Sequence, residues 1–198
     1  MTMRVCIYTA ICGDCDDLKP QPGQTINTDF VCFTDARKLP RVPPWTVIQS
    51  RRRMDLHPRM RAKYFKIQSH RVFPGGWPDS IEAPPLNQEH SPYDYLIWID
   101  GSGQIRDANF VDRVISRVGS SGWAMFNHPN RECIYDEAVF SMTMQKYHKL
   151  PIREQVESYR AEGYPAGNGL MACTLIARDA RRVDLNGINE SWWQENLR

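Results

Sequence analysis

The chain lacks the long apolar run and the strong charge bias that would assign it to a membrane or to a polyanionic partner. None of its segments approaches the roughly 20 consecutive apolar residues of a membrane-spanning helix. Its formal net charge is only +2, which argues against a nucleic acid as the partner. The first strand-like run, residues 4–8, begins without a separate signal-peptide core, so the expected compartment is the cytoplasm.

Three common catalytic motifs are also missing. No Gly-x-x-x-x-Gly-Lys-Ser/Thr loop is present, which excludes a P-loop nucleotidase of the usual kind. No Gly-x-Gly-x-x-Gly follows the first predicted strand, which argues against a dinucleotide oxidoreductase. The Gly-x-Ser-x-Gly elbow of serine hydrolases is absent as well.

The cysteines do not form a recognisable zinc or redox site. Cys12 and Cys15 make a lone Cys-x-x-Cys, whereas a structural zinc site would need a second pair at similar spacing. The neighbouring acids Asp14 and Asp16 would oppose formation of the thiolate that a thioredoxin-like site uses. We therefore expect reduced thiols in a loop.

The pattern that is present alternates strands with helices along a chain of 198 residues, which fits one globular domain over residues 1–198. Strands are predicted at residues 4–10, 30–34, 45–48, 93–100, 123–126 and 170–177. Helices are predicted at residues 59–71, 109–118, 137–148 and 152–162, with one more leading to residues 192–193. This order predicts an α/β fold with a mostly parallel central sheet flanked by helices. Residues 74–92, rich in Pro and Gly, are predicted to form a surface excursion.

Acidic residues follow three of the predicted strands. The loop after the first strand contains several acids, Asp35 follows the second strand, and Asp100 follows the fourth. Ligands of open α/β sheets bind outside the carboxyl ends of the strands, so these carboxylates predict a site at one edge. Gly101 and Gly103 let the backbone turn sharply after Asp100. An ordinary Asp-Gly turn is the alternative.

Cations precede the Asp100 strand. Arg59 and Lys63 lie one turn apart on the predicted helix and therefore share a face. These cations would bind phosphate groups, and a metal ion held by Asp100 would bridge the same phosphates. The alternative is a solvated basic helix face. The residues alone thus indicate an α/β domain that binds an anionic, nucleotide-bearing ligand with the help of a metal.

Several segments together resemble one family. They are residues 8–11, 33–35, 59–63, 98–102, 128–137, 162–165 and 192–193. The most specific is His-Pro-x-Arg-x-Cys-Ile-Tyr-x-Glu at residues 128–137, since no general requirement of a fold dictates it. The chain is similar, from near residue 4 to its C-terminus, to a glycosyltransferase-like family of plants and bacteria. Some plant members of that family were once labelled alkaline ceramidases.

The resemblance implies a GT-A-like, Rossmann-like fold, a nucleotide-sugar donor, expected to be a UDP-sugar, and Mn²⁺ or Mg²⁺ as cofactor. It further implies that Thr9 and Ala10 line the nucleotide and that Asp35 binds the base or ribose. Arg59 and Lys63 would face the diphosphate. Asp100 would take the place of the first acid in the Asp-x-Asp metal motif of GT-A enzymes.

One position departs from that motif. Its second acid is replaced by Ser102, so metal binding must rest on Asp100 with another ligand or water, and Ser102 is assigned to the sugar. His128 is a candidate for the further ligand; a structural histidine is the alternative. The resemblance also implies a polar segment and a strand after residue 198. We thus expect a compact version or a C-terminally truncated fragment, in which a catalytic or metal-binding residue would be missing.

An inverting transferase needs a general base, and Asp136 or Glu137 is the candidate. Either acid would otherwise stabilise the start of a helix. Arg131 is predicted to bind a phosphate of donor or acceptor, or to form a surface ion pair.

The remaining predictions concern sugar contacts. Asn168 would meet a sugar hydroxyl or form part of a tight turn. Trp192 and Trp193 would stack on an acceptor sugar, although one of them is expected in the core.

The sequence therefore predicts a metal-dependent hexosyl- or pentosyltransferase that moves a sugar from a nucleotide-diphosphate sugar to a glycan or a small hydroxyl acceptor. Neither nucleic acid nor a membrane span is expected. Two alternatives remain open: a metal-dependent hydrolase, and a catalytically silent module that binds a nucleotide sugar.

Overall fold

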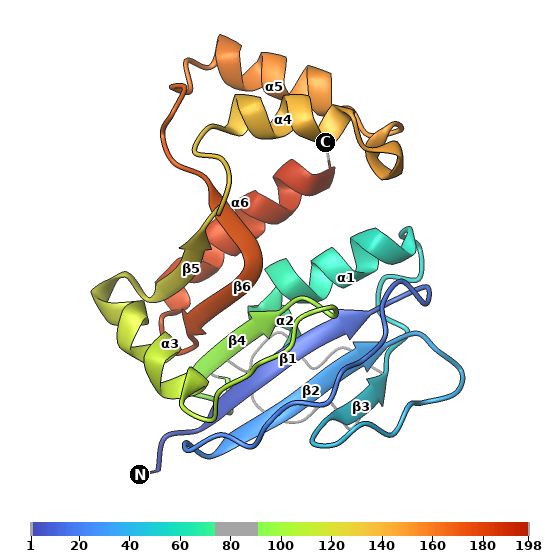
Figure 1. Ribbon diagram of the computed structural model, residues 1–198, viewed down its shortest axis with the longest axis vertical. Helices are drawn as coiled ribbons and strands as arrows, with labels where there is room; N and C mark the ends of the chain where they lie inside the picture. The colour runs from blue at the N-terminus through green and yellow to red at the C-terminus, as the bar shows by residue number, and fades with distance from the viewer. Residues whose placement is uncertain (1, 74–90, 198) are drawn as a thin grey trace. The chain divides into compact units, whose positions relative to one another are not determined.

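The computed structural model describes residues 2–73 and 91–197 (Figure 1). Most of the predicted excursion at residues 74–92 lies outside these ranges. The chain divides into two compact units. Unit 1 comprises Met1–Ala124 and Thr174–Arg198, and unit 2 comprises Met125–Cys173.

Strands and helices alternate through most of the described chain. The strands are β1 (Val5–Ile11), β2 (Thr28–Thr34), β3 (Thr46–Gln49), β4 (Tyr95–Ile99), β5 (Trp123–Asn127) and β6 (Met171–Asp179). The α-helices are α1 (Pro58–Ile67), α2 (Ser69–Val72), α3 (Phe110–Val118), α4 (Ile134–Met142), α5 (Ile152–Ala161) and α6 (Asn186–Leu197). Among the described residues, every helix is too short or too polar to cross a membrane.

The strands form one mixed sheet in the order β3-β2-β1-β4-β6-β5. β1 pairs in parallel with β2 on one side and with β4 on the other, as Figure 1 shows at the centre of the sheet. β3 pairs in parallel with β2, whereas β6 runs antiparallel to β4. The predicted α/β fold with a mostly parallel sheet is thereby confirmed.

α3 covers one face of the sheet. Its Val111, Val114 and Val118 are buried in a core cluster with Ile7 of β1 and Ile97 of β4. The three valines recur at the three- and four-residue spacing of a helix, so α3 turns a single apolar stripe toward the strands. The helix predicted at residues 109–118 is therefore present as α3.

An aromatic core covers the other face, beneath α1 and α2. Phe33 of β2 stacks on Phe65 of α1 with ring centroids 4.6 Å apart. Tyr8 of β1 meets Phe73 at 5.0 Å and Trp98 of β4 at 5.4 Å, both edge to face. Such pairs contribute beyond the area that they bury. Helices on both faces explain why all seven residues of β1 are buried.

The helix predicted at residues 59–71 is interrupted at Gln68, where the backbone leaves the helical region and α2 begins. The side chain of Gln68 is fully buried and donates a hydrogen bond to the carbonyl of Asn189 in α6 (3.0 Å). This interaction with a distant helix accompanies the break, and local sequence does not encode it.

Unit 2 contains α4 and α5, which pack through the buried residues Tyr135, Ala138 and Val156. α4 begins at Ile134 and ends at Met142, so the helix predicted at residues 137–148 was placed too late. Cys133 directly precedes the helix. Backbone hydrogen bonds from Gly167, Asp136 and Tyr135 lower the pKa of its thiol. The residues after α4 form a short 3-10 turn instead.

Two glutamines join the loop before β2 to the loop after β4. Gln21, which is buried, donates from Nε2 to the carbonyl of Gly103 (3.1 Å) and accepts the Ile105 N–H at Oε1 (2.8 Å). Gln24 accepts the N–H of Val111, near the start of α3 (3.1 Å). Side-chain amides therefore satisfy backbone groups that have no partner strand here.

We predict that Gln21→Leu lowers the free energy of unfolding by about 3 kcal/mol, because the Ile105 N–H would stay buried without an acceptor. Gln104→Leu is the matched control, since Gln104 is exposed; its effect should stay below about 0.5 kcal/mol. Urea denaturation measures both. Equal effects for the two variants would contradict the assigned role of Gln21.

An imidazole links α2 to α6. The ring nitrogen Nε2 of His70 lies 2.7 Å from the Glu190 carboxylate, which also receives the Arg71 guanidinium at 2.6 Å. Burial lowers the pKa of His70 below its ordinary value of 6.5, more than the carboxylate raises it. His70 is therefore neutral at pH 7 and donates an uncharged N–H to Glu190.

This shift predicts a pH dependence of stability. Because the unfolded chain takes up a proton near pH 6.5 and the folded chain only at lower pH, acidification favours unfolding in that window. The free energy of unfolding should fall as the pH drops from 6.5 to the lower pKa of the folded state. Above pH 6.5 the contribution of His70 should not change with pH. His70→Gln keeps a donor but removes the titrating ring, so its slope in this window should be smaller. Denaturation series between pH 7.5 and 5 measure the difference, and identical slopes would refute the prediction.

Candidate active site at the carboxyl edge of the sheet

The loops after β1 and β4 meet at Gly101. A Cβ at this position would lie 2.9 Å from Cγ1 of Ile11 and 3.2 Å from both Cβ and Oδ2 of Asp16. Only glycine allows this approach without displacing a neighbour. β1 and β4 are adjacent parallel strands, and the chain reverses its direction across the sheet between them, which is where α/β sheets bind ligands. The predicted acids after the first and fourth strands therefore share one edge.

Asp100 follows β4 at this edge, and one of its oxygens is already engaged. Oδ1 accepts hydrogen bonds from the Lys66 ammonium at 3.0 Å and from the Trp98 indole N–H at 2.8 Å. Neither bond involves Oδ2, and the Asp100 side chain is 35% exposed. Sequence reasoning missed Lys66 as a partner, although it lies seven residues after Arg59 on the same helix face.

Asp35, predicted to bind the base or ribose, has partners within the protein. Its Oδ1 accepts the Gly13 N–H at 2.9 Å, and its Oδ2 lies 2.7 Å from the Arg61 guanidinium. Both side chains of the ion pair are nearly buried, at 14% and 9% exposure. The pair joins β2, α1 and the loop after β1, so Asp35 has a structural role whatever else it binds. Sequence reasoning did not pair Arg61 with Asp35, because the two residues belong to different elements and meet only in the fold.

The cysteine pair in the same loop does not resemble a redox site. Burial, reinforced by Asp35, raises the pKa of the Cys12 thiol to about 12. Cys12 therefore remains protonated at neutral pH, while Cys15 is exposed.

The residues predicted to line the nucleotide and the sugar differ in accessibility. Thr9 and Ala10 are buried within β1, at 1% and 5% exposure. Ser102 is exposed, and its carbonyl accepts the Lys19 ammonium at 2.7 Å. The accessible part of the edge therefore begins in the loops after the strands.

The predicted phosphate-binding cations lie on α1 and are half-buried. The Lys63 ammonium donates to Oδ1 of Asn196 in α6 at 2.7 Å. The backbone N–H of Arg59 is capped by the imidazole of His57 at the start of α1. Lys66, one turn further along α1 than Lys63, contacts Asp100 through its ammonium group.

The double tryptophan divides between core and surface. Trp193 is 4% exposed and packs edge-on against Tyr64 of α1, with ring centroids 5.4 Å apart. Trp192 is half-buried, and its ring lies 6.3 Å from that of Trp123. Trp193 is thus the core residue of the pair, and Trp192 is the better candidate for stacking on a sugar.

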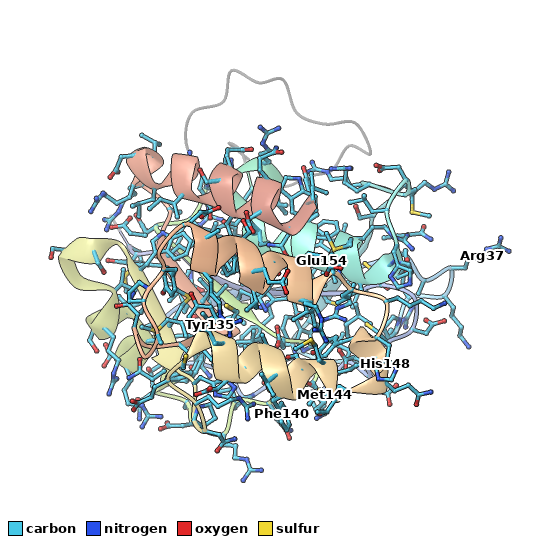
Figure 2. The ribbon with its side chains drawn as sticks, turned by 90° about the horizontal axis from the view of Figure 1, so that it is seen from above. Arg37, Tyr135, Phe140, Met144, His148 and Glu154 are labelled. Atoms are coloured by element: carbon cyan, nitrogen blue, oxygen red, sulfur yellow. The ribbon has the colours of Figure 1, made fainter. Side chains whose placement is uncertain are left out.

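The segment at residues 128–137 forms an ionic cluster within unit 2. Nδ1 of His128 accepts the backbone N–H groups of Asn130 (3.3 Å) and Arg131 (3.1 Å), so the ring proton resides on Nε2. Nε2 lies 3.7 Å from the Glu137 carboxylate, which also accepts a hydrogen bond from Arg131. The Arg131 guanidinium lies 4.1 Å from the centroid of Phe140, labelled on α4 in Figure 2. His128, Arg131 and Glu137 therefore orient one another.

The other predicted residues of unit 2 lie outside this cluster. Asp136 is exposed in the first turn of α4, so its carboxylate is more accessible than that of Glu137. Asn168 lies between Gly167 and Gly169, whose φ angles are +67° and +81°, and donates to the Tyr164 hydroxyl at 3.2 Å. The tight turn expected as an alternative for Asn168 is present.

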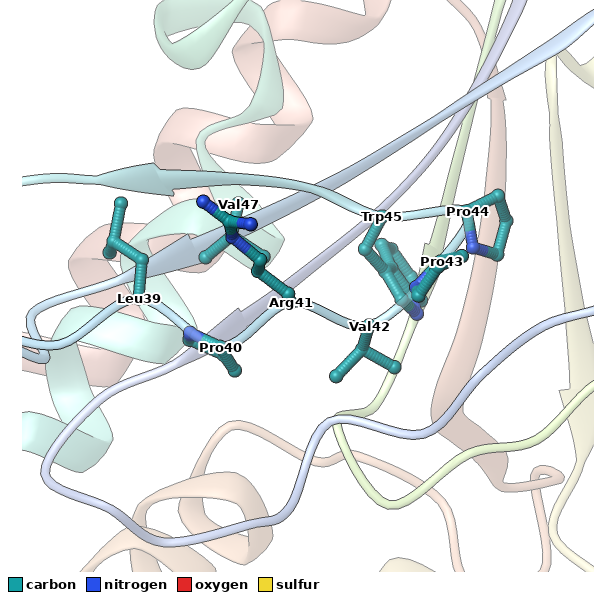
Figure 3. Close-up of a pocket in the computed structure, with 8 residues that line it drawn as sticks. All are labelled: Leu39, Pro40, Arg41, Val42, Pro43, Pro44, Trp45 and Val47. Carbon is teal, nitrogen blue, oxygen red and sulfur yellow. The ribbon is translucent and has the colours of Figure 1, made fainter.

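A groove of about 580 Å³ lies elsewhere, along residues 39–45 and Val47 (Figure 3). It precedes the amino end of β3, whereas Asp100 follows the carboxyl end of β4. Arg41 is the charged residue of its lining, which otherwise consists of apolar side chains. Without acid or nucleophile, the groove does not account for chemistry.

Within residues 2–73 and 91–197, no three acidic, histidine or cysteine side chains converge into a ready-made metal site. Mg²⁺ and Mn²⁺ often bind through one or two carboxylates together with substrate phosphates. The Asp100 carboxylate, whose Oδ2 takes part in neither of its two hydrogen bonds, fits that mode.

A comparison with known protein families matches part of the chain. The family described as TOD1/MUCI70, glycosyltransferase-like domain, matches residues 86–169, which include β4, Asp100 and the segment at 128–137. The match confirms the resemblance to a glycosyltransferase-like family and supports a function of that general kind. None of the curated proteins matches the chain.

We predict that Gly101→Ala lowers the free energy of unfolding by about 1 to 3 kcal/mol, because the new methyl group would overlap Ile11 and crowd Asp16. Gly23→Ala is the control, since a Cβ there meets nothing within 4 Å. Its stability should stay the same or rise slightly. Thermal denaturation compares the two, and an unchanged Gly101→Ala would show that the loops do not need this close approach.

Proposed function

We propose that this chain, with its glycosyltransferase-like domain, transfers a hexose or pentose from a nucleotide-diphosphate sugar, most simply a UDP-sugar, to a hydroxyl group of a glycan or small acceptor. The observation that carries the proposal is the position of Asp100. Its carboxylate lies at the point where the strand order reverses, and Lys66 and Trp98 orient it through one oxygen while the other takes part in neither bond.

Asp100 would hold Mn²⁺ or Mg²⁺ through Oδ2. Asp16, which lies against Gly101, is another acid at this edge of the sheet. When bound, the ion would neutralise charge on the departing diphosphate. Trp98 is buried and fixes the carboxylate through its indole N–H, so Asp100 is oriented before any ligand arrives. Arg59 and Lys63 remain the proposed contacts of the diphosphate.

The acceptor hydroxyl must lose a proton if the reaction inverts the anomeric centre. Asp136 is the proposed base, because its carboxylate is exposed whereas that of Glu137 is engaged by Arg131. Trp192 is the proposed platform for a sugar ring, since Trp193 is buried.

The proposal predicts metal-dependent stabilisation by one nucleotide sugar. A donor present at a hundredfold excess over its dissociation constant should add about 2.7 kcal/mol to the stability of the native chain. Asp100→Asn should abolish the part of this shift that requires Mn²⁺. Asp112→Asn, which removes an exposed carboxylate on α3, should retain it. Thermal denaturation with a panel of nucleotide sugars, with and without Mn²⁺, measures these shifts.

The outcomes separate the alternatives. No response to any nucleotide would refute a transferase that uses such a donor, and hydrolysis of amides or phosphoesters without nucleotide would favour a hydrolase. Binding without transfer or donor hydrolysis would indicate a silent sugar-binding module, which the Ser102 substitution in the metal motif would explain.

A further inference from the structure

Lys66 is fixed on the carboxylate at the centre of the proposed site. It lies in the last turn of α1, and its ammonium is 3.0 Å from Oδ1 of Asp100 and 5.5 Å from the centroid of the Trp98 ring. The Lys66 side chain is only 15% exposed. Its carbonyl accepts the Tyr8 hydroxyl at 3.4 Å, which ties the same residue to β1. A cation held in this way compensates the Asp100 charge from within the protein.

The same carboxylate is the proposed ligand of a divalent cation, so two positive charges would compete for it. Their mutual repulsion across one carboxylate would weaken both interactions. A lysine can relieve this conflict, because its ammonium carries three donors on a flexible four-carbon stem. The diphosphate of a donor bound at the same ion offers the ammonium another anion nearby.

We propose that Lys66 is an exchangeable counter-ion: it neutralises Asp100 while the site is empty and moves to the donor diphosphate when metal and donor bind. The inference rests on the proposed function. It assigns a phosphate contact in addition to Arg59 and Lys63. Lys66 is thus a positioning residue in the empty site and a binding residue in the loaded one.

A structural salt bridge makes a different prediction from an exchangeable one. If Lys66 only anchors α1 to β4, its removal should disturb the site and weaken the binding of metal and nucleotide together. If Lys66 exchanges, its removal should strengthen Mn²⁺ binding in the absence of nucleotide and weaken nucleotide binding in the presence of Mn²⁺. The two effects have opposite signs.

The test measures both affinities on the full chain. Electron paramagnetic resonance follows Mn²⁺ binding without nucleotide, and calorimetry follows UDP binding in saturating Mn²⁺. For Lys66→Met we expect Mn²⁺ to bind about fivefold more tightly and UDP about tenfold more weakly. Lys66→Gln, which keeps a donor without the charge, should show the same signs and replaces Lys66→Met if that variant does not fold. Lys38→Met is the charge-matched control at an exposed position, and both of its affinities should equal those of wild type.

The outcomes distinguish this inference from the proposed function. Affinities that fall together, or that do not change, in the Lys66 variants would overturn the exchange while leaving the transferase intact. Wild type that binds neither Mn²⁺ nor UDP would overturn both. Opposite signs in the Lys66 variants, with Lys38→Met unchanged, would establish the exchange.

Discussion

The parallel pairing of β1 with a strand on each side is the constraint on which the rest of unit 1 depends. β1 is buried on both faces, and its register with β2 and β4 aligns the carboxyl ends of all three strands. The chain continues from β1 outward to β3 and then returns to β4 on the opposite side. The loops after β1 and β4 therefore border the same edge, and the acids that they carry are brought together by backbone geometry.

Much of this arrangement could be predicted because central strands must be apolar on both faces. The runs that became β1, β2 and β4 were found to within a few residues. The direction of β6 was not, since an apolar run does not encode whether a strand is parallel or antiparallel to its neighbour. The break at Gln68 also escaped prediction, because its hydrogen-bond partner lies 121 residues away. Long-range contacts of this kind leave no periodic signal.

The site shows the same division between features encoded locally and features that depend on long-range contacts. Asp100 was predicted from the strand that precedes it, which is local information. Its partner Lys66 was not, because the spacing of basic residues along a helix does not show which of them reaches β4. The burial of Arg61 was missed for a related reason: it is paired with Asp35, and that pairing forms only in the fold. The roles of the unit 2 residues remain predictions.

The hydrogen bond from Trp98 to Asp100 makes the Trp98 indole a reporter of the carboxylate. Since the indole N–H and the Lys66 ammonium share one carboxylate oxygen, any change of partner at Asp100 alters the field at the indole proton. With six tryptophans, the chain yields a small set of indole signals in a ¹H–¹⁵N spectrum. The signal of Trp98 is thus a built-in spectroscopic label for the state of this carboxylate, and it needs neither a substrate nor a chemical tag.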